Sequence, residues 1–265
     1  MSAALAAVLE DLDAVAIAVS GGVDSMTLAA FAGRRLGPDR ALMVHAVSPA
    51  VPAEATRRVQ DQARVEGWRL ELVDAGEFAD PAYLANPVNR CFFCKTSLYG
   101  AIAARSSRQV LSGANMDDLA EYRPGLDAAR ERGVRHPYLE VGMDKAAVRA
   151  LARDLGLTAV AELPASPCLS SRVETGLRID PLELAAIHAV EQLVGARLAP
   201  RTVRCRLRAS GVVVELDPGS LAGLGEDRRG ALVAEIAGRL PPALAAKGVS
   251  FAAYRTGSAF LVSQP

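Results

Sequence analysis

The sequence predicts an α/β protein, a doubly wound parallel sheet followed by a smaller C-terminal α+β domain. Short apolar runs rich in Val, Leu and Ile alternate with helical segments, a pattern typical of a parallel sheet covered on both faces. Farther along, a helix precedes two runs of alternating residues that predict a hairpin. We expect a first domain at 1–160, a connector at 161–178 and a second domain at 179–265.

The elements of the first domain follow in order. An uninterrupted apolar run that ends at glycines predicts the first strand at 14–19. Further strands are predicted at 41–47, 68–73 and 109–112, and a helix at 51–66 that Gly67 closes. Ligands of such sheets lie at the carboxyl ends of the strands, where Ser20 and Val47 fall. His45 is the one polar residue of its strand, and we interpret it as a core histidine with satisfied hydrogen bonds.

The first strand runs into Ser-Gly-Gly-Val-Asp-Ser at 20–25, and a helix capped by Asp24 or Ser25 follows. Backbone N–H groups at such a turn favour an anion, the glycines allow its close approach, and the serines add hydroxyl donors. Asp24 would repel a bare phosphate, so it indicates Mg²⁺ or a capping role. The string resembles the pyrophosphate-binding loop of the ATP pyrophosphatases, or PP-loop enzymes, which cleave ATP between its α- and β-phosphates. A glycine-rich turn without a ligand is the alternative.

Composition limits the partners of the chain. Lys plus Arg and Asp plus Glu both number 30, so the net charge is zero, which weighs against a nucleic-acid substrate. No uncharged apolar run is long enough to span a bilayer, and we see no signal peptide, so we expect no membrane association and a cytoplasmic protein. In the cytoplasm, four cysteines indicate metal binding or catalysis rather than disulfides.

Cys91 and Cys94 form a Cys-x-x-Cys pair, which can present two thiolates to one metal or cluster. A redox pair and two buried small side chains are the alternatives. At 113–118, a Gly-x-Asn-x-Asp-Asp turn offers oxygen ligands for Mg²⁺ or a ribose, or simply caps the next helix. Asp144 is the predicted cap of a helix ending near Leu155. Lys145 in its first turn opposes the helix dipole, so it either meets a bound pyrophosphate or is solvated.

The connector carries Cys168 between two prolines and the Ser171–Arg172 pair, a thiol, a hydroxyl and a guanidinium suited to a phosphate or carboxylate. Beyond it, we predict helices at 180–194 and 227–240, a hairpin of 202–208 with 211–216, and a strand at 249–251. Arg204, Arg206 and Arg208 share one strand face, either solvated or an anion cradle, whereas Cys205 faces the core. A turn at 254–258 is another candidate anion site.

Taken together, these stretches resemble the ATP-dependent sacrificial sulfur transferases of the LarE family, which mature the nickel-pincer cofactor of lactate racemase. The resemblance rests on 20–25, 86–95, 113–118 with 122–125, 167–172, the arginine strand and 254–258, so it covers nearly the whole chain. It implies a PP-loop ATP-binding fold at 1–160. It also implies that pyridinium-3,5-biscarboxylic acid mononucleotide is adenylated by ATP and Mg²⁺ and then converted to the bisthiocarboxylic acid mononucleotide.

The resemblance also implies roles for particular residues. ATP and Mg²⁺ would contact the loop, the backbone near Ala46 and Val47 would meet adenine, and Cys168, Ser171, Arg172 and Asp24 would be catalytic. The cofactor-binding set would be Ser20, Gly21, Gly22, Asp24, Ser25, Ala46, Val47, Asn115, Asp118, Lys145, Arg204, Arg206 and Arg255. We would expect an acidic residue or two in relatives where this chain has 250–253, which leaves the details of substrate contact open.

Two sulfur sources occur in this family. In one, the cysteine at the position of Cys168 gives up its sulfur and becomes dehydroalanine; in the other, it holds a [4Fe-4S] cluster together with a Cys-x-x-Cys pair. Cys91, Cys94 and Cys168 favour the cluster. The resemblance implies a homo-oligomer and other nickel-pincer enzymes as partners. A tRNA thiolase, an amide-forming ligase and a non-enzymatic iron–sulfur or nucleotide sensor are the rival interpretations.

Overall fold

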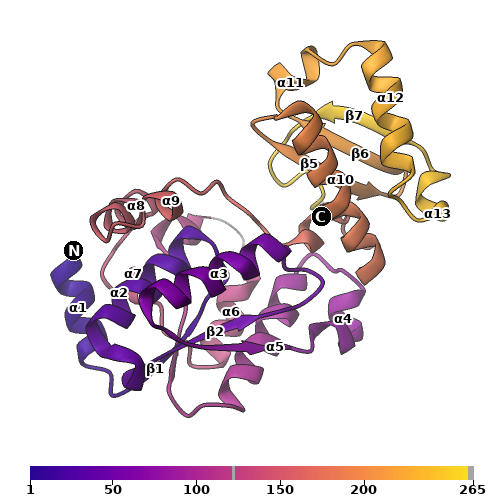
Figure 1. The fold of residues 1–265 in the computed structure, drawn as a ribbon. Helices are drawn as coiled ribbons and strands as arrows, with labels where there is room; N and C mark the ends of the chain where they lie inside the picture. The colour runs from indigo at the N-terminus through magenta and orange to yellow at the C-terminus, as the bar shows by residue number, and fades with distance from the viewer. Residues whose placement is uncertain (121–122, 262–265) are drawn as a thin grey trace. The chain divides into compact units, whose positions relative to one another are not determined.

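The computed structural model describes residues 1–120 and 123–261, so Tyr122 of the predicted 122–125 stretch lies outside the described residues. The chain divides into two compact units (Figure 1). Unit 1 comprises Met1–Asp80 and Asn89–Ser166, and unit 2 comprises Pro81–Val88 and the chain from Pro167 onward. In the described part of the chain, no helix is both long and apolar enough to cross a membrane.

Unit 1 contains a parallel sheet of four strands in the order β3-β2-β1-β4. The strands are β1 (Val15–Ala18), β2 (Ala41–Ala46), β3 (Arg69–Val73) and β4 (Gln109–Leu111). The predicted fold class is therefore confirmed, and each predicted strand lies within a residue or two of its observed bounds. Because the first two strands in the chain lie at the centre, the turn after β1 sits at the middle of the carboxyl edge.

Helices cover both faces of this sheet (Figure 1). Val15 and Ile17 of β1 pack with α1 (Ser2–Glu10), α2 (Val23–Arg40) and α8 (Lys145–Asp154), whereas Ala16 faces the opposite cluster with α5 (Arg90–Ala103). This alternation is the period-two pattern of a strand buried on both faces. The other elements of unit 1 are α3 (Ala53–Glu66), α6 (Pro124–Glu131), α7 (Pro137–Glu140), α9 (Thr158–Ala161), η1 (Glu77–Ala79) and η2 (Met116–Ala120).

Unit 2 is built on a mixed sheet of three strands in the order β5-β6-β7. The predicted hairpin is confirmed, since β5 (Val203–Arg208) pairs antiparallel with β6 (Gly211–Leu216), while β7 (Val249–Ala253) runs parallel to β6. Asp180 caps α10 (Pro181–Leu198) by accepting hydrogen bonds from the N–H groups of Leu182 and Glu183. The remaining elements are η3 (Leu169–Arg172), α11 (Pro218–Ala222), α12 (Glu226–Ala237) and α13 (Pro242–Ala245).

One short segment is grouped differently from the predicted division of the chain. Residues 81–88, which include α4 (Pro81–Leu84), belong to unit 2 although their neighbours on both sides belong to unit 1. Asn86 is fully buried in a left-handed conformation at φ 52°, and its amide donates to the Glu174 carbonyl at 2.8 Å. Tyr83 bonds the Ser170 hydroxyl at 2.6 Å. These contacts join the segment to the stretch that follows Cys168.

Candidate active site

The turn after β1 folds into a tight loop that only glycine fits at its centre. Gly21 has φ +81°, and a Cβ built there would lie 2.9 Å from the Ala55 carbonyl oxygen. Arg58 donates from Nη1 to the Gly21 carbonyl at 2.6 Å. The loop therefore packs against α3, and its backbone leads into the start of α2 with no side chain at Gly21 in the way.

The helix that follows the loop begins earlier than the sequence prediction places it. Gly22 is the N-cap of α2 and no side chain caps this helix, so the prediction that Asp24 or Ser25 is the cap was wrong. Ser25 instead accepts a hydrogen bond from the Ser20 backbone at 3.0 Å, and the two hydroxyls lie 3.0 Å apart. Because the N-cap Gly22 has no side chain to bond the first turn of α2, the N–H groups of that turn can serve an anion.

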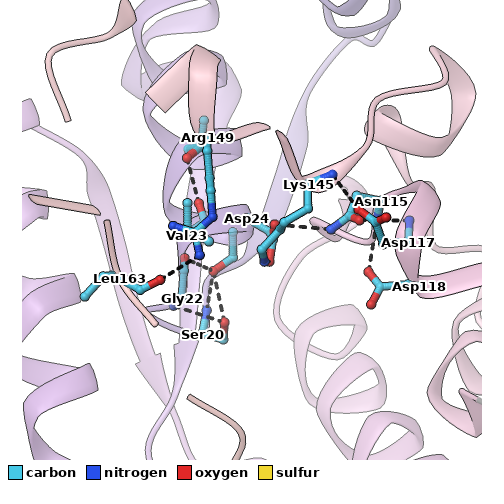
Figure 2. Close-up of polar contacts among 12 residues, drawn as sticks. Ser20, Gly22, Val23, Asp24, Asn115, Asp117, Asp118, Lys145, Arg149 and Leu163 are labelled. Carbon is cyan, nitrogen blue, oxygen red and sulfur yellow. Dashed lines mark hydrogen bonds and ion pairs between the residues drawn. The ribbon is translucent and has the colours of Figure 1, made fainter. Parts of the chain in front are cut away.

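Asp24, in the first turn of α2, is the meeting point of three elements (Figure 2). Its Oδ2 lies 2.5 Å from the Nζ of Lys145, the first residue of α8. Its Oδ1 accepts from the amide of Asn115 at 3.2 Å, and its backbone carbonyl accepts from the buried Tyr138 hydroxyl at 3.2 Å. Residues about a hundred positions from Asp24 in the sequence thus lie beside the loop at 20–25.

The Gly-x-Asn-x-Asp-Asp turn is both a self-capped turn and a source of oxygen ligands. Asp118 accepts from the Asn115 backbone at 3.0 Å, and Asp117 accepts from the Lys145 backbone at 2.6 Å. Arg123 pairs with Asp118 at 3.1 Å. Gly113 is required here, because a Cβ would come within 2.9 Å of the α2 backbone. The turn is thereby fixed directly against Asp24.

The donor set beside the loop fits Mg²⁺. This ion is usually held by one or two carboxylates together with substrate phosphates. Asp24 supplies a half-exposed carboxylate beside open N–H groups, and Asp118 supplies a second on the neighbouring turn. Within the described ranges no group of three or more His, Cys, Asp or Glu side chains is placed to hold a metal ion.

The carboxyl end of β2 carries the other predicted nucleotide contacts. Val47 is 42% exposed, and its backbone N–H continues the pairing with Val73. His45, one residue before Ala46, is buried between the Val19 carbonyl at 2.7 Å and the Thr56 hydroxyl at 2.9 Å. Burial lowers the pKa of His45, with the Val19 contact acting in the opposite direction. The prediction of a satisfied core histidine is confirmed.

The cysteines belong to different units. Cys91 and Cys94 lie three residues apart at the start of α5, on one face of the helix, and both are half-buried. Cys168 belongs to unit 2, where it is half-buried at the start of η3. Three thiolates are a suitable donor set for an iron–sulfur cluster, but the three-cysteine ligand set stays a prediction. Cys205 is fully buried in the core, as predicted, and burial raises its pKa.

Arg172 holds the loop around Cys168 through hydrogen bonds to its backbone. This arginine is 3% exposed, and its Nη1 donates to the carbonyls of Pro167 at 2.6 Å and Cys168 at 3.1 Å. The rest of the guanidinium pairs with Glu191 of α10. In this structure, Arg172 is therefore engaged within unit 2, and the polar group it would offer a substrate is already bonded.

The arginine strand is not a solvated face. Arg206 is 4% exposed and joins Glu215 at 3.0 Å to the Ser171 carbonyl at 3.0 Å. Arg208 also pairs with Glu215, at 2.9 Å. Burial tends to raise the pKa of Glu215, but the Ser258 hydrogen bond and these arginines outweigh it and lower the pKa. Glu215 thus binds two members of the row together.

Two members of the row contact the predicted turn at 254–258: Arg208, which donates to the Ser258 carbonyl at 3.0 Å, and Arg204. The Arg204 guanidinium is 5.9 Å from the centre of the Tyr254 ring and donates to the Val203 carbonyl at 2.7 Å. Burial, followed by the positive charge of Arg172, lowers the pKa of Arg204. Arg255 is exposed. Because Glu191 and Glu215 pair with Arg172, Arg206 and Arg208, Arg204 and Arg255 are the arginines here that suit an anionic substrate group.

Several residues of these clusters were not predicted. They are Arg58 and Tyr138, which contact the loop at 20–25 and the first turn of α2, Glu191, which pairs with Arg172, and Glu215, which pairs with Arg206. Glu215 left a signal, because it is the one charge inside the apolar run of β6, which predicts a buried ion pair. The others lie on amphipathic helices or short turns, where nothing in the local pattern marks them.

Comparison with known proteins gives three informative relatives, and no protein-family model matches the chain. It is 41% identical over 212 residues to an uncharacterized protein of Synechocystis sp., covering 78% of each chain. It is 32% identical over 218 residues to the pyridinium-3,5-bisthiocarboxylic acid mononucleotide synthase of Lactiplantibacillus plantarum, covering 81% of this chain and 78% of the relative. An uncharacterized protein of Methanocaldococcus jannaschii is 23% identical over 207 residues.

The parallel sheet and the glycine loop before α2 are consistent with an α/β protein of the PP-loop fold type. Its extended similarity to a named enzyme narrows this class. The chain belongs to the LarE family, the family of the pyridinium-3,5-bisthiocarboxylic acid mononucleotide synthase. The relationship supports an enzyme of related function.

Proposed function

We propose that this protein is an ATP-dependent sulfur transferase that adenylates and thiolates the carboxylates of pyridinium-3,5-biscarboxylic acid mononucleotide. The product is the bisthiocarboxylic acid mononucleotide of nickel-pincer cofactor biosynthesis. The observation that carries the proposal is the loop at 20–25, with Asp24 beside an uncapped helix start, in a chain related to a synthase named for that product. A carboxylate is a poor electrophile, and adenylation gives it a leaving group that sulfur can displace.

The residues of unit 1 would bind and orient the nucleotide. The N–H groups at the start of α2, with the Ser20 and Ser25 hydroxyls, would hold the pyrophosphate that leaves. Asp24 and the turn of Asn115 and Asp118 would hold Mg²⁺, which would neutralise phosphate charge when bound. The backbone at Ala46 and Val47 would meet adenine. Each of these groups lies at the carboxyl edge of the sheet, where such folds bind ligands.

The residues of unit 2 would hold the substrate and the sulfur chemistry. Arg204 and Arg255 would face its phosphate or carboxylates, whereas Arg206, buried in its ion pair with Glu215, would support the strand that carries Arg204. Cys168, with Cys91 and Cys94, would bind a [4Fe-4S] cluster, which would supply an open iron that carries the sulfide for transfer. Arg172 and Ser171 would fix the backbone that presents the Cys168 thiolate. We further propose that the protein is cytoplasmic and homo-oligomeric and acts alongside the other enzymes of this pathway.

The test uses protein purified without oxygen. Iron and acid-labile sulfide are measured first, and the protein is then incubated with ATP, Mg²⁺ and the biscarboxylic mononucleotide while AMP, pyrophosphate and thiolated product are followed. We expect about four irons per chain and one AMP for each sulfur transferred. The matched control is Cys205→Ser, which removes a buried thiol outside the proposed ligand set and should retain iron.

Each other outcome has a defined meaning. Absence of iron, with conversion of Cys168 to dehydroalanine after turnover, would replace the cluster with the sacrificial route. Thiolation of tRNA, or amide formation that persists in the Cys91→Ser variant, would replace the substrate assignment. Nucleotide binding without pyrophosphate release from any carboxylate substrate would leave a sensor rather than a transferase.

A further inference from the structure

Lys145 occupies a position that local helix energetics disfavour. It is the first residue of α8, where the positive end of the helix dipole opposes a cationic side chain. The helix is already capped by Asp144, whose Oδ1 accepts from the Ala147 backbone at 2.7 Å. The backbone N–H of Lys145 donates to the Asp117 carboxylate. The side chain therefore adds nothing to the helix start, and its contribution is the ion pair with Asp24.

That ion pair joins two groups which a magnesium–triphosphate complex would need separately (Figure 2). Asp24 is held at one oxygen by Lys145 at 2.5 Å and at the other by Asn115 at 3.2 Å. The side chains of Asp24 and Lys145 are 26% and 36% exposed, so both can reach solvent and a ligand. While the pair is closed, Asp24 is occupied by an ammonium and Lys145 is neutralised by a carboxylate.

We propose that the Asp24–Lys145 pair is an exchangeable latch that couples triphosphate binding to Mg²⁺. When the metal arrives with the nucleotide, Asp24 turns to the metal and Lys145 turns to a phosphate oxygen. No proton moves, because carboxylate and ammonium keep their charges and only exchange partners. A triphosphate without metal cannot compete, since the carboxylate holds Lys145 and repels the phosphates. This inference rests on the proposed function, which places ATP at this loop.

Charge around the pair favours this direction of exchange. Asp117 and Asp118 lie on the turn beside Asp24, and Arg123 pairs with Asp118 rather than with Asp24. Among the described residues, Lys145 is therefore the cation that forms an ion pair with Asp24. Removing the Asp24 charge should therefore leave Lys145 available to a phosphate, whereas removing Lys145 should leave Asp24 available to a metal.

The experiment is calorimetric titration of inorganic pyrophosphate and a non-hydrolysable ATP analogue, each with and without Mg²⁺. The wild-type protein should bind both ligands only with Mg²⁺. Asp24→Asn should bind metal-free pyrophosphate at least about tenfold more tightly than wild type and lose most of its Mg²⁺ dependence. The double variant Asp24→Asn, Lys145→Gln should lose that gain, because the released ammonium is absent.

The matched control is Asp144→Asn, which removes one negative charge next to Lys145 and keeps an oxygen that can cap α8. An equal gain in this variant would assign the effect to general electrostatics and overturn the latch. A reciprocal measurement covers the case in which Asp24→Asn does not fold. Lys145→Gln should bind Mg²⁺ alone at least about threefold more tightly than wild type, and no gain would also overturn the latch.

The two levels of inference fail differently. If the wild-type protein binds neither ligand even with Mg²⁺, the proposed ATP site is wrong. If it binds them with Mg²⁺ but Asp24→Asn shows no metal-free gain, the ATP site stands and only the exchange is rejected.

Discussion

Arg172 and Glu191 form a two-point ion pair, in which Nε lies 3.0 Å from Oε1 and Nη2 lies 3.0 Å from Oε2. The same Oε1 accepts from the Cys205 backbone at 2.9 Å, so one carboxylate joins α10, β5 and the loop of Cys168. The planar guanidinium matches the carboxylate in a way that lysine cannot. The position of Cys168 therefore depends on the buried ion pair between Arg172 and Glu191.

Arg172→Ala should strongly destabilise unit 2. The substitution leaves Glu191 as an uncompensated charge and removes the Arg172 donor from the Pro167 and Cys168 carbonyls, at a cost of about 3–5 kcal/mol. Denaturant unfolding of the full chain measures this loss. The control is Arg197→Ala, which breaks an exposed pair between Arg197 of α10 and Glu235 and should cost about 1 kcal/mol or less. Comparable losses in the two variants would contradict the structural role of Arg172.

Gly21→Ala should abolish nucleotide binding at the loop. Alanine at positive φ costs about 1–2 kcal/mol, and its Cβ would also meet the Ala55 carbonyl at 2.9 Å, which displaces the loop from α3. Gly76→Ala separates the two effects, because Gly76 has φ +78° with open space around it. The measurements are melting temperature and affinity for a non-hydrolysable ATP analogue. If Gly21→Ala binds the analogue as Gly76→Ala does, the loop is not the phosphate site.

Local sequence patterns predicted the features that are locally determined. The strand–glycine–helix sequence at 14–25 specified the loop, and the single acidic residue before an amphipathic run identified Asp144 as a cap. Period-two alternation placed the arginines of β5 on one face and Cys205 in the core. In each case a short window contains the physical cause, whether apolar burial, a side-chain cap or strand geometry.

Features that depend on long-range contacts were not predictable in this way. Asp24 and Lys145 are 121 residues apart in the sequence, and only the packing of α8 against α2 joins them. Arg58 contacts Gly21 from the neighbouring helix. The cap of α2 was wrong by two residues because Ser25 bonds back to the loop instead. The membership of 81–88 in unit 2 depends likewise on contacts with a distant stretch.

Asn86→Ala should weaken the attachment of the 81–88 segment. It removes the hydrogen bond to the Glu174 carbonyl and places alanine at φ 52° in a fully buried position. We expect a loss of about 1–3 kcal/mol, measured by denaturant unfolding. Asn86→Gly should lose less, because glycine accepts this φ. Asn89→Ala, at φ −93° and without a side-chain cap bond, is the control and should cost less than either.

Stability should fall in mild acid because of two histidines, His45, which is buried, and His136, which is half-buried. Burial lowers the pKa of His45 and of His136, the latter against the opposing charges of Glu140 and Asp118. Between the folded pKa and the ordinary value near 6.5, the unfolded chain binds protons that the folded chain does not. The contribution of these histidines to the free energy of unfolding should therefore level off near pH 7 and decrease as the pH falls through 6.5 toward the folded pKa, with a slope of at most one proton per histidine. Unfolding by urea at a series of pH values measures this, and His45→Gln should remove part of the slope. A wild-type stability that does not change between pH 7 and 5 would show that these histidines charge as easily in the folded chain as in the unfolded one.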